Sequence, residues 1–502
     1  MSRPAAFARL IHASWVLVRA DALIPREIDS VLPPTARLAA RTLRLFSGSQ
    51  ARQGGPGARL ARSLESLGPA AIKLGQVLST RADMFGRAFA DDLGRLKDRL
   101  EPFPTATARA VVAATLERPV ESLFTTFDDP IAAASLAQAH PATLADGRKV
   151  AVKVLRPGID RKVFRDIETI MMAAGLIERG IPLARRLEPR ALAATVAQSL
   201  RLELDLRLEA AGASEMGEVM ARDPYMRAPA VIWDGVGRRA LTLEWAPGMP
   251  LSDPAALEQP GLDRPLLATN LMRGFLSQAM DHGVFHADLH EGNLFIGPPA
   301  VITAVDFGIM GRLGPVARKH LAEILWGFLQ RDYTRVARAH FDAGYVPEHH
   351  SIDAFAQALR SVGEPSVGKP AHEVSMGRLL GQLFEITAMF DMHLRPELVL
   401  LQKTMVTVEG VARRIDPQHD RWAAAEPIAR RWITRELSPA ARIREFADDA
   451  AKALRAMARF ADPPAPVVII EEKKTGVAER ILWLVLGAAL AALAFAGAAL
   501  IR

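Results

Sequence analysis

Three polar side chains in the middle of the chain have the types and order that phosphoryl transfer from ATP requires. In His286-Ala287-Asp288-Leu289-His290-Glu291-Gly292-Asn293 an asparagine lies five residues after Asp288, and Asp306 of Asp306-Phe307-Gly308 follows thirteen residues later. In such a site one carboxylate faces the acceptor or attacking water, while an amide oxygen and a second carboxylate hold metal ions on the phosphates. The alternative is a plain loop in which Asp288 caps a turn. Apolar, strand-like runs flank both strings and favour the catalytic interpretation.

A nucleotide site of this type also needs a lysine on a strand and a loop that covers the phosphates. Val150–Leu155 is rich in β-branched residues around Lys153, which predicts such a strand. The stretch before it is rich in alanine where a protein kinase has glycines. Alanine does not readily adopt a positive φ, so this backbone must approach phosphate differently or more rigidly. The residues of this loop are Ala132, Ala133, Ala134, Ser135, Leu136, Ala137 and Gln138.

The lysine normally needs a glutamate on a helix to orient it. A strongly helical run is predicted from about Arg190 to Glu218, in which Asp205 and Glu209 are four residues apart and share a face. Glu209 lies 56 residues after Lys153, so an inserted segment is required between them. We predict that this insertion is a helix over Ile159–Gly180.

Another helix is predicted upstream, after Gly68-Pro69. Lys73 and Gln76 are three residues apart and can project from one face of it. Gly75 between them costs about 1 kcal/mol relative to alanine inside a helix, so we expect a packing or functional reason for it.

Together these strings resemble the UbiB family of atypical kinase-like proteins. The resemblance covers roughly residues 60–320 and rests on six features in order: the Lys-x-Gly-Gln helix, the alanine-rich loop, the Val-Ala-Val-Lys strand, the Glu203-x-Asp205 helix, the His-x-Asp string and Asp-Phe-Gly. It implies a function for each matched position. Lys153 contacts phosphates and pairs with Glu209, Asp288 is the catalytic-loop carboxylate, Asn293 and Asp306 bind Mg²⁺, and Lys73 and Gln76 reach into the nucleotide site with Glu203 and Asp205 as polar partners.

The resemblance also implies a fold and an activity. The expected fold is α+β: a protein-kinase-like, two-lobed, mainly helical fold with an N-terminal helical extension and a C-terminal transmembrane helix. The expected activity is that of an atypical kinase or ATPase that uses Mg²⁺ with ATP or ADP and supports ubiquinone biosynthesis, through ATP-driven access to polyprenyl lipid precursors. Expected partners are those quinone precursors, membrane lipid and other ubiquinone-biosynthesis proteins. Glu291 departs from the family, which commonly has proline there, and adds a negative charge beside the metal site.

Protein phosphorylation is the less expected activity. Ala287 replaces the arginine of a typical protein-kinase catalytic loop, and the chain passes from Gly308 almost directly into a predicted amphipathic helix, 315–325. No long loop ending in Ala-Pro-Glu is found, so a docking platform for protein substrates is missing. Two other functions remain open: a small-molecule kinase of the aminoglycoside or choline type, and a non-catalytic scaffold that binds nucleotide.

The amino-acid composition excludes cysteine chemistry and disfavours nucleic acid as a partner. The chain has no cysteine, which excludes disulfides, thiol nucleophiles and cysteine-ligated metal sites. Its formal net charge is +7 and its aromatic content only 6%. Basic residues are not interleaved with aromatic ones, so nucleic-acid binding is disfavoured and attraction to anionic lipid fits better.

The chain is expected to contain several parts. A strand at the end of the predicted N-lobe, leading into Glu244 and Trp245, resembles a kinase hinge, whose backbone would hydrogen-bond adenine. Ile481–Ile501 is uncharged and long enough to cross about 30 Å of hydrocarbon, which predicts a single-pass anchor in the inner membrane, a cytoplasmic catalytic body and a small-residue stripe suited to a homodimer. The predicted parts are an amphipathic arm (1–59), the Lys-x-Gly-Gln module (60–125), an N-lobe (126–248), a helical C-lobe (249–460), a linker (461–480) and the anchor (481–502).

Overall fold

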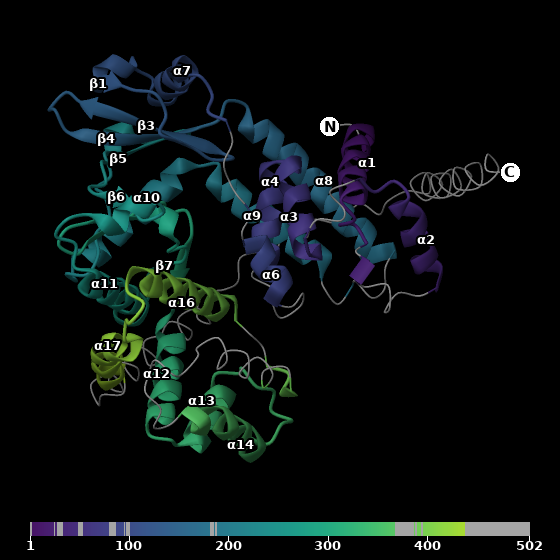
Figure 1. The fold of residues 1–502 in the computed structure, drawn as a ribbon, viewed down its shortest axis with the longest axis vertical. Helices are drawn as coiled ribbons and strands as arrows, with labels where there is room; N and C mark the ends of the chain where they lie inside the picture. The colour runs from purple at the N-terminus through teal and green to yellow at the C-terminus, as the bar shows by residue number, and fades with distance from the viewer. Residues whose placement is uncertain are drawn as a thin grey trace, which may run out of the picture. The chain divides into compact units, whose positions relative to one another are not determined.

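The computed structural model describes residues 3–24, 26–27, 34–48, 54–79, 87–94, 96, 101–180, 185, 188–366, 386, 389–392 and 395–436. The chain divides into a compact unit, Met1–Ser438, and a second unit, Pro439–Arg502. Every element below belongs to the first unit (Figure 1).

In the part of the chain that the structure describes, the first unit is mainly helical, with three small sheets. Its helices are α1 (Arg3–Arg19), α2 (Pro34–Arg44), α3 (Pro56–Leu67), α4 (Pro69–Ser79), α6 (Arg87–Gly94), α7 (Thr105–Leu116), α8 (Ile159–Gly180), α9 (Pro189–Glu203), α10 (Leu206–Met220), α11 (Arg264–Ser277), α12 (Pro315–Leu329), α13 (Tyr333–Asp342), α14 (Ile352–Gly363), α16 (Pro396–Ile415) and α17 (Arg421–Glu436). Its strands are β1 (Phe124–Phe127), β2 (Ala132–Ala133), β3 (Ala137–Leu144), β4 (Lys149–Leu155), β5 (Ala240–Glu244), β6 (Met249–Pro250), β7 (Val284–His286), β8 (Leu294–Gly297), β9 (Val301–Ala304) and β10 (Met310–Arg312).

An antiparallel sheet in the order β1-β3-β4-β5, with β2 paired to β3, forms the N-lobe. In β4 the side chains of Val150, Val152 and Val154 are buried on one face, as the period of two in a strand requires. Helix α7 covers that face and contributes Ala108 and Val112 to the same core (Figure 1). The predicted boundary at residue 125 therefore separates α7 from the sheet on which it packs.

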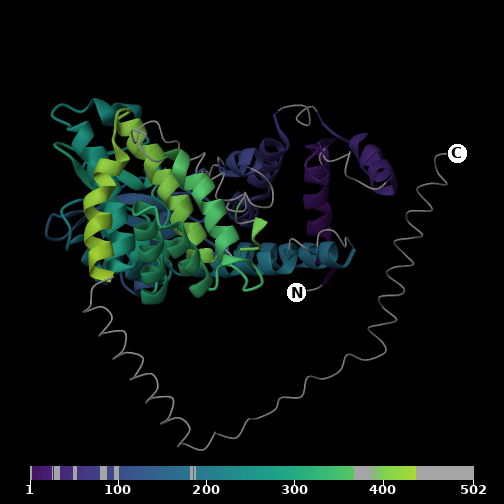
Figure 2. The same ribbon diagram turned by 90° about the horizontal axis from the view of Figure 1, so that it is seen from below.

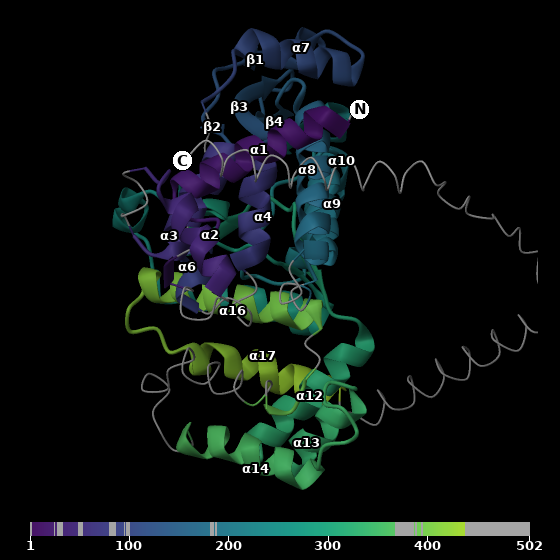
Figure 3. The ribbon, with the colours of Figure 1, turned by 90° about the vertical axis from the view of Figure 1, so that its right-hand side faces the viewer.

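Helices α8 and α9 pack on each other and on the N-terminal helices. Helix α8 spans the predicted range, Ile159–Gly180, and contacts α9, α1 and α4. Arg9 of α1 donates a hydrogen bond to the hydroxyl of Thr169 over 3.1 Å, and Figures 2 and 3 show α1 against α8. The inserted helices thus belong with the Lys-x-Gly-Gln module.

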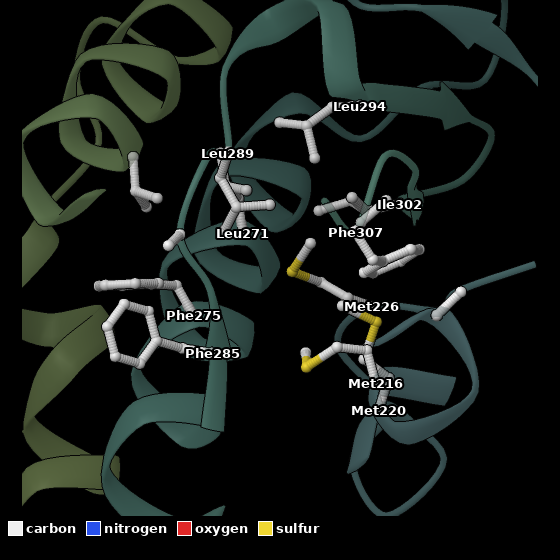
Figure 4. Close-up of a cluster of buried hydrophobic side chains, with 14 of the residues drawn as sticks. Met216, Met220, Met226, Leu271, Phe275, Phe285, Leu289, Leu294, Ile302 and Phe307 are labelled. Atoms are coloured by element: carbon white, nitrogen blue, oxygen red, sulfur yellow. The ribbon is translucent and has the colours of Figure 1, made fainter. Parts of the chain in front are cut away.

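The C-lobe is organised around the buried helix α11, which packs against α16 and α17 (Figure 1). Its core continues through β7, β8 and β9 to α10, where methionine and phenylalanine side chains fill the space between elements (Figure 4). Phe307 of the Asp-Phe-Gly string is part of this core and is 2% exposed. The Asp-Phe-Gly string is therefore anchored to the C-lobe core by the packing of Phe307.

Two predictions require correction. The helix expected from Arg190 to Glu218 is interrupted at Leu204-Asp205, where α9 ends and Asp205 caps α10, so Asp205 and Glu209 do not share a helical face.

The prediction of a single-pass anchor at the inner membrane is not supported by the structure. Within the described ranges no helix is both long and apolar enough to cross a bilayer, and residues 481–502 lie outside those ranges.

Candidate nucleotide site

The ammonium group of Lys153 lies between two carboxylates that come from distant parts of the chain. Its Nζ is 2.7 Å and 2.9 Å from the two carboxylate oxygens of Glu209 on α10. It is also 3.5 Å from Oδ1 of Asp306. Strand β4, helix α10 and the Asp-Phe-Gly string therefore meet at one lysine, and the contact with Glu209 is the one that the family resemblance implies.

Electrostatics keep the lysine charged. Burial lowers the pKa of Lys153, but Asp306 and Glu209 together raise that pKa above its usual range. The Lys153 ammonium lowers the pKa of Asp306. Burial raises the pKa of Glu209 to about 7, against the opposing effect of Lys153. The Glu209 side chain is 10% exposed and that of Asp306 is 49% exposed. Asp306 is thus the carboxylate that can also reach a ligand.

Glu209 is held at this distance because α10 lies directly against the Asp-Phe-Gly backbone. Gly212, one turn after Glu209, faces Phe307, and a Cβ at this position would lie 2.9 Å from the Phe307 carbonyl oxygen. Any other residue would push the helix away. The sequence gives no local signal for this glycine.

The catalytic loop is ordered by hydrogen bonds from His286. The Nε2–H of His286 donates to the Val305 carbonyl over 3.0 Å, and its Nδ1 accepts from the backbone N–H of Asp288 over 3.1 Å. Burial lowers the pKa of His286, so the ring is neutral and this tautomer satisfies both bonds. The Asp288 side chain is 38% exposed, with Nε2 of His290 3.7 Å from its Oδ2. Asp288 is therefore oriented through its backbone and accessible to a substrate.

The oxygen donors at the site suit Mg²⁺. The side-chain amide of Asn293 donates to the Asp288 carbonyl over 3.0 Å, which leaves Oδ1 of Asn293 as the atom that can bind a cation. Asp306 has a positive φ of 64°, a conformation that aspartate tolerates better than most residues. An amide oxygen and a carboxylate are hard ligands of the kind that Mg²⁺ prefers. The residues present thus fit the ion.

Arg156 holds the alanine-rich loop in place through two hydrogen bonds to its carbonyl groups. Within Ala132–Gln138, all of which is described, no residue has a positive φ. The backbone N–H of Arg156 donates to Leu136 over 2.8 Å, and its Nε donates to the carbonyl of Ala134 over 2.9 Å. Gln138 is buried and its amide exchanges two 2.9 Å hydrogen bonds with the backbone of Phe103, so it contacts protein groups. Sequence reasoning missed Arg156, although it follows Lys153 by only three residues.

The strand predicted to lead into Glu244 and Trp245 is β5, which ends at Glu244. The backbone N–H of Glu244 donates to Ala230 over 2.8 Å, and that of Trp245 donates to Lys149 over 3.1 Å. Both donors are used inside the protein. Gly248 follows with a φ of +92°, and a Cβ there would lie 2.2 Å from the carbonyl oxygen of Ile296, so glycine is required at this turn.

The structure brings Lys73 and Glu203 together but places Asp205 elsewhere. Lys73 of α4 is buried and forms an ion pair with Glu203 at the end of α9. The negative charge of Glu203 also raises the pKa of Glu209, after burial and Asp306, so this pair lies within electrostatic range of the site. Asp205 instead pairs with Arg207 over 2.6 Å. Gln76 lies one turn after Lys73 and is half-buried.

Gly75 has a packing reason. A Cβ on it would lie 2.3 Å from Cδ1 of Leu96 and 2.8 Å from Cδ1 of Leu64. The glycine therefore lets α4 approach α3 closely, and it need not contact nucleotide.

Helix α16 supports the catalytic loop through two residues that sequence reasoning missed. The hydroxyl of Thr404 lies 3.0 Å from the Ala287 carbonyl oxygen and 2.8 Å from the Leu400 carbonyl oxygen of its own helix, so its one proton is shared between these two acceptors. Arg414 forms an ion pair with Glu291, so the extra negative charge predicted beside the metal site is neutralised. These pairs are 117 and 123 residues apart in sequence, and no local pattern could have indicated them.

Two known domain families match most of the chain that carries this site. Residues 95–340 match the ABC1 atypical kinase-like domain, and residues 359–420 match the UbiB helical domain. Helix α16, which contacts the catalytic loop, lies wholly within the second match.

Curated relatives cover most of the chain. A protein of Marinobacter nauticus called "Probable protein kinase UbiB" is 37% identical over 447 residues, covering 87% of this chain and 81% of the relative. One of Xanthomonas axonopodis pv. citri with the same name is 41% identical over 403 residues, covering 78% and 72%. The Rv3197 protein of Mycobacterium tuberculosis, solved in complex with erythromycin, is 22% identical with a TM-score of 0.53, and the match covers 80% of this chain and 98% of that one. At that identity the likeness concerns the fold alone.

Proposed function

The chain belongs to the UbiB family of atypical kinase-like proteins, and on this premise we propose that it binds a Mg²⁺–nucleotide and releases or transfers the terminal phosphate in support of ubiquinone biosynthesis. One observation carries the proposal: the Lys153 ammonium lies between Glu209 and Asp306. Such a lysine supplies positive charge to phosphate oxygens when a helical glutamate holds it and a metal-binding aspartate stands opposite.

Each residue has a distinct part in this reaction. Glu209 holds Lys153 so that its ammonium can bind the nucleotide phosphates. Asn293 and Asp306 would hold Mg²⁺, which neutralises charge on the phosphates. Asp288 accepts the proton of the acceptor hydroxyl or of the attacking water, and His286 fixes the backbone from which Asp288 projects.

The acceptor in this proposal is a small molecule or water rather than a protein side chain. Between Asp306 and α12, which begins at Pro315, the described chain contains only the short strand β10. An extended activation segment, on which protein kinases dock their substrates, has no room there. Polyprenyl precursors of ubiquinone are the substrates, or the molecules made accessible, that the family resemblance favours.

Phosphate release from ATP tests the proposal directly. We expect Mg²⁺-dependent release by the wild type and at least a hundredfold loss in Asp306→Asn and Asp288→Asn. Asp146→Asn is the matched control, because Asp146 is exposed and pairs only with Arg148 in the β3–β4 turn. No nucleotide binding by the wild type, or full activity in Asp306→Asn, would overturn the proposal.

Quinone analysis tests the biological part separately. A strain lacking this chain should accumulate ubiquinone precursors, and wild type but not Asp306→Asn should restore ubiquinone. Restoration by Asp288→Asn, with nucleotide still bound, would favour a non-catalytic scaffold. Recovery of a phosphorylated soluble metabolite would favour a small-molecule kinase instead.

A further inference from the structure

Away from the nucleotide site, three side chains from two distant segments direct ligand atoms at one another. His349 and His350 lie in the connection between α13 and α14, and Asp391 follows His350 by 41 residues. The Nε2 of His350 is 3.4 Å from Oδ2 of Asp391, and the Nε2 of His349 is 3.9 Å from the same oxygen. The three ligand atoms all lie within 4.8 Å of one another. Two consecutive residues therefore turn both rings toward a single carboxylate oxygen.

These separations are close to those around a bound metal ion. Zinc holds nitrogen and oxygen ligands at about 2.0–2.2 Å in a tetrahedron, which places neighbouring ligand atoms roughly 3.3 Å apart. The contact between His350 and Asp391 already has this length. The Nε2 of His349 lies farther from that oxygen, at 3.9 Å, and the 66% exposed side chain of His349 has room to turn toward it.

The fold fixes part of the site in advance. The ring of His350 packs edge-on against Phe390, with centroids 5.3 Å apart, and Phe390 packs in turn against Phe355. Both phenylalanines belong to the buried cluster of α13 and α14. Asp391, adjacent to Phe390, is 69% exposed. The site thus combines an anchored ligand with two accessible ones, and an ion can enter from solvent.

We propose that His349, His350 and Asp391 form a binding site for Zn²⁺ or a similar divalent transition-metal ion. Two imidazoles and one carboxylate are ligands that zinc accepts, whereas Mg²⁺ and Ca²⁺ prefer oxygen alone. Three protein ligands leave a fourth position for water. The ion links the α13–α14 connection to the segment around Phe390, and it is independent of the Mg²⁺–nucleotide site.

The competing explanation is a hydrogen-bonded histidine–aspartate cluster that binds no ion. Equilibrium dialysis distinguishes a metal site from such a cluster. The full chain, without a histidine tag and after chelator treatment, is dialysed against Zn²⁺ as the only transition metal, with Mg²⁺ in excess. The variants are His349→Ala and Asp391→Asn, which change exposed side chains. The control is His12→Ala, an exposed histidine of α1. His290 and Asp288 could bind zinc as well. The quantity compared is therefore the difference in bound Zn²⁺ per chain between the wild type and each site variant.

The expected result is one Zn²⁺ per chain that both site variants lose, with at least a tenfold weaker affinity, while His12→Ala retains it. Zinc should also raise the melting temperature of the wild type and of His12→Ala but not of Asp391→Asn. If the wild type binds no zinc, or if His349→Ala and Asp391→Asn bind as the wild type does, the proposal is overturned.

Discussion

Gly212 of α10 touches the backbone of Phe307 so closely that no side chain fits between them. This contact joins the helix that carries Glu209 to the string that carries Asp306. The spacing of the two carboxylates around Lys153 therefore depends on a glycine that has no polar atom of its own in the site.

Substitution of that glycine should separate the carboxylates. Gly212→Ala places a Cβ 2.9 Å from the Phe307 carbonyl oxygen, and such overpacking costs about 1–3 kcal/mol. We expect weaker nucleotide binding and lower phosphate release. Gly217→Ala is the control, because nothing lies within 4 Å of a Cβ there and alanine favours a helix. Equal effects of the two substitutions on nucleotide affinity would contradict this explanation.

The free energy of unfolding should depend on pH through Glu209. Its pKa is about 7 in the folded chain against an ordinary 4.5, so between these values the folded state binds the extra proton. Stability from this group is complete below pH 4.5 and is lost as the pH rises through 7, by about 3 kcal/mol in total. Urea unfolding from pH 5 to pH 8 should show this fall in the wild type and not in Glu209→Gln. Parallel curves would disprove the raised pKa.

The ion pair between Lys73 and Glu203 should stabilise the fold. Lys73→Met leaves Glu203 unpaired at a poorly exposed position, which should cost about 1–3 kcal/mol. A double-mutant cycle with Glu203→Gln measures the coupling by urea unfolding. The exposed pair Arg148–Asp146 is the control, with an expected coupling below about 1 kcal/mol. A coupling no larger than that of the control would show that the pair contributes little.

Helix α16 should affect turnover more than nucleotide affinity. Thr404→Val keeps the shape of the side chain but removes the hydroxyl proton that the Ala287 carbonyl shares with the Leu400 carbonyl. If the hydrogen bond that orients the loop contributes about 1.5 kcal/mol to the transition state, its loss lowers kcat about tenfold with little change in KM for ATP. Thr404→Ser should restore activity. Thr407→Val is the control, since that exposed hydroxyl bonds only within its own helix. A change in KM alone would contradict a positioning effect.

Local patterns predicted the elements that carry the site, and long-range contacts escaped them. The strand around Lys153 and the helix Ile159–Gly180 have the predicted bounds to within a residue or two, and a strand does lead into Glu244, because each element has its own apolar period and end signals. The break at Leu204 was missed since neither glycine nor proline marks it, and only Asp205, a good N-cap residue, indicated it.

The pairing of Lys153 with Glu209 followed from the family resemblance rather than from spacing. The contacts of Thr404 and Arg414 with the catalytic loop depend on how α11 and α16 pack. Such packing is decided by the whole C-lobe, and no short string in the sequence reports it.

Both nitrogens of the His286 ring are occupied by the protein backbone, one as donor and one as acceptor. This imidazole therefore has no free nitrogen with which to accept or donate a proton. In the proposed reaction its part is to hold the backbone from which Asp288 projects, and the proton of the acceptor passes to Asp288.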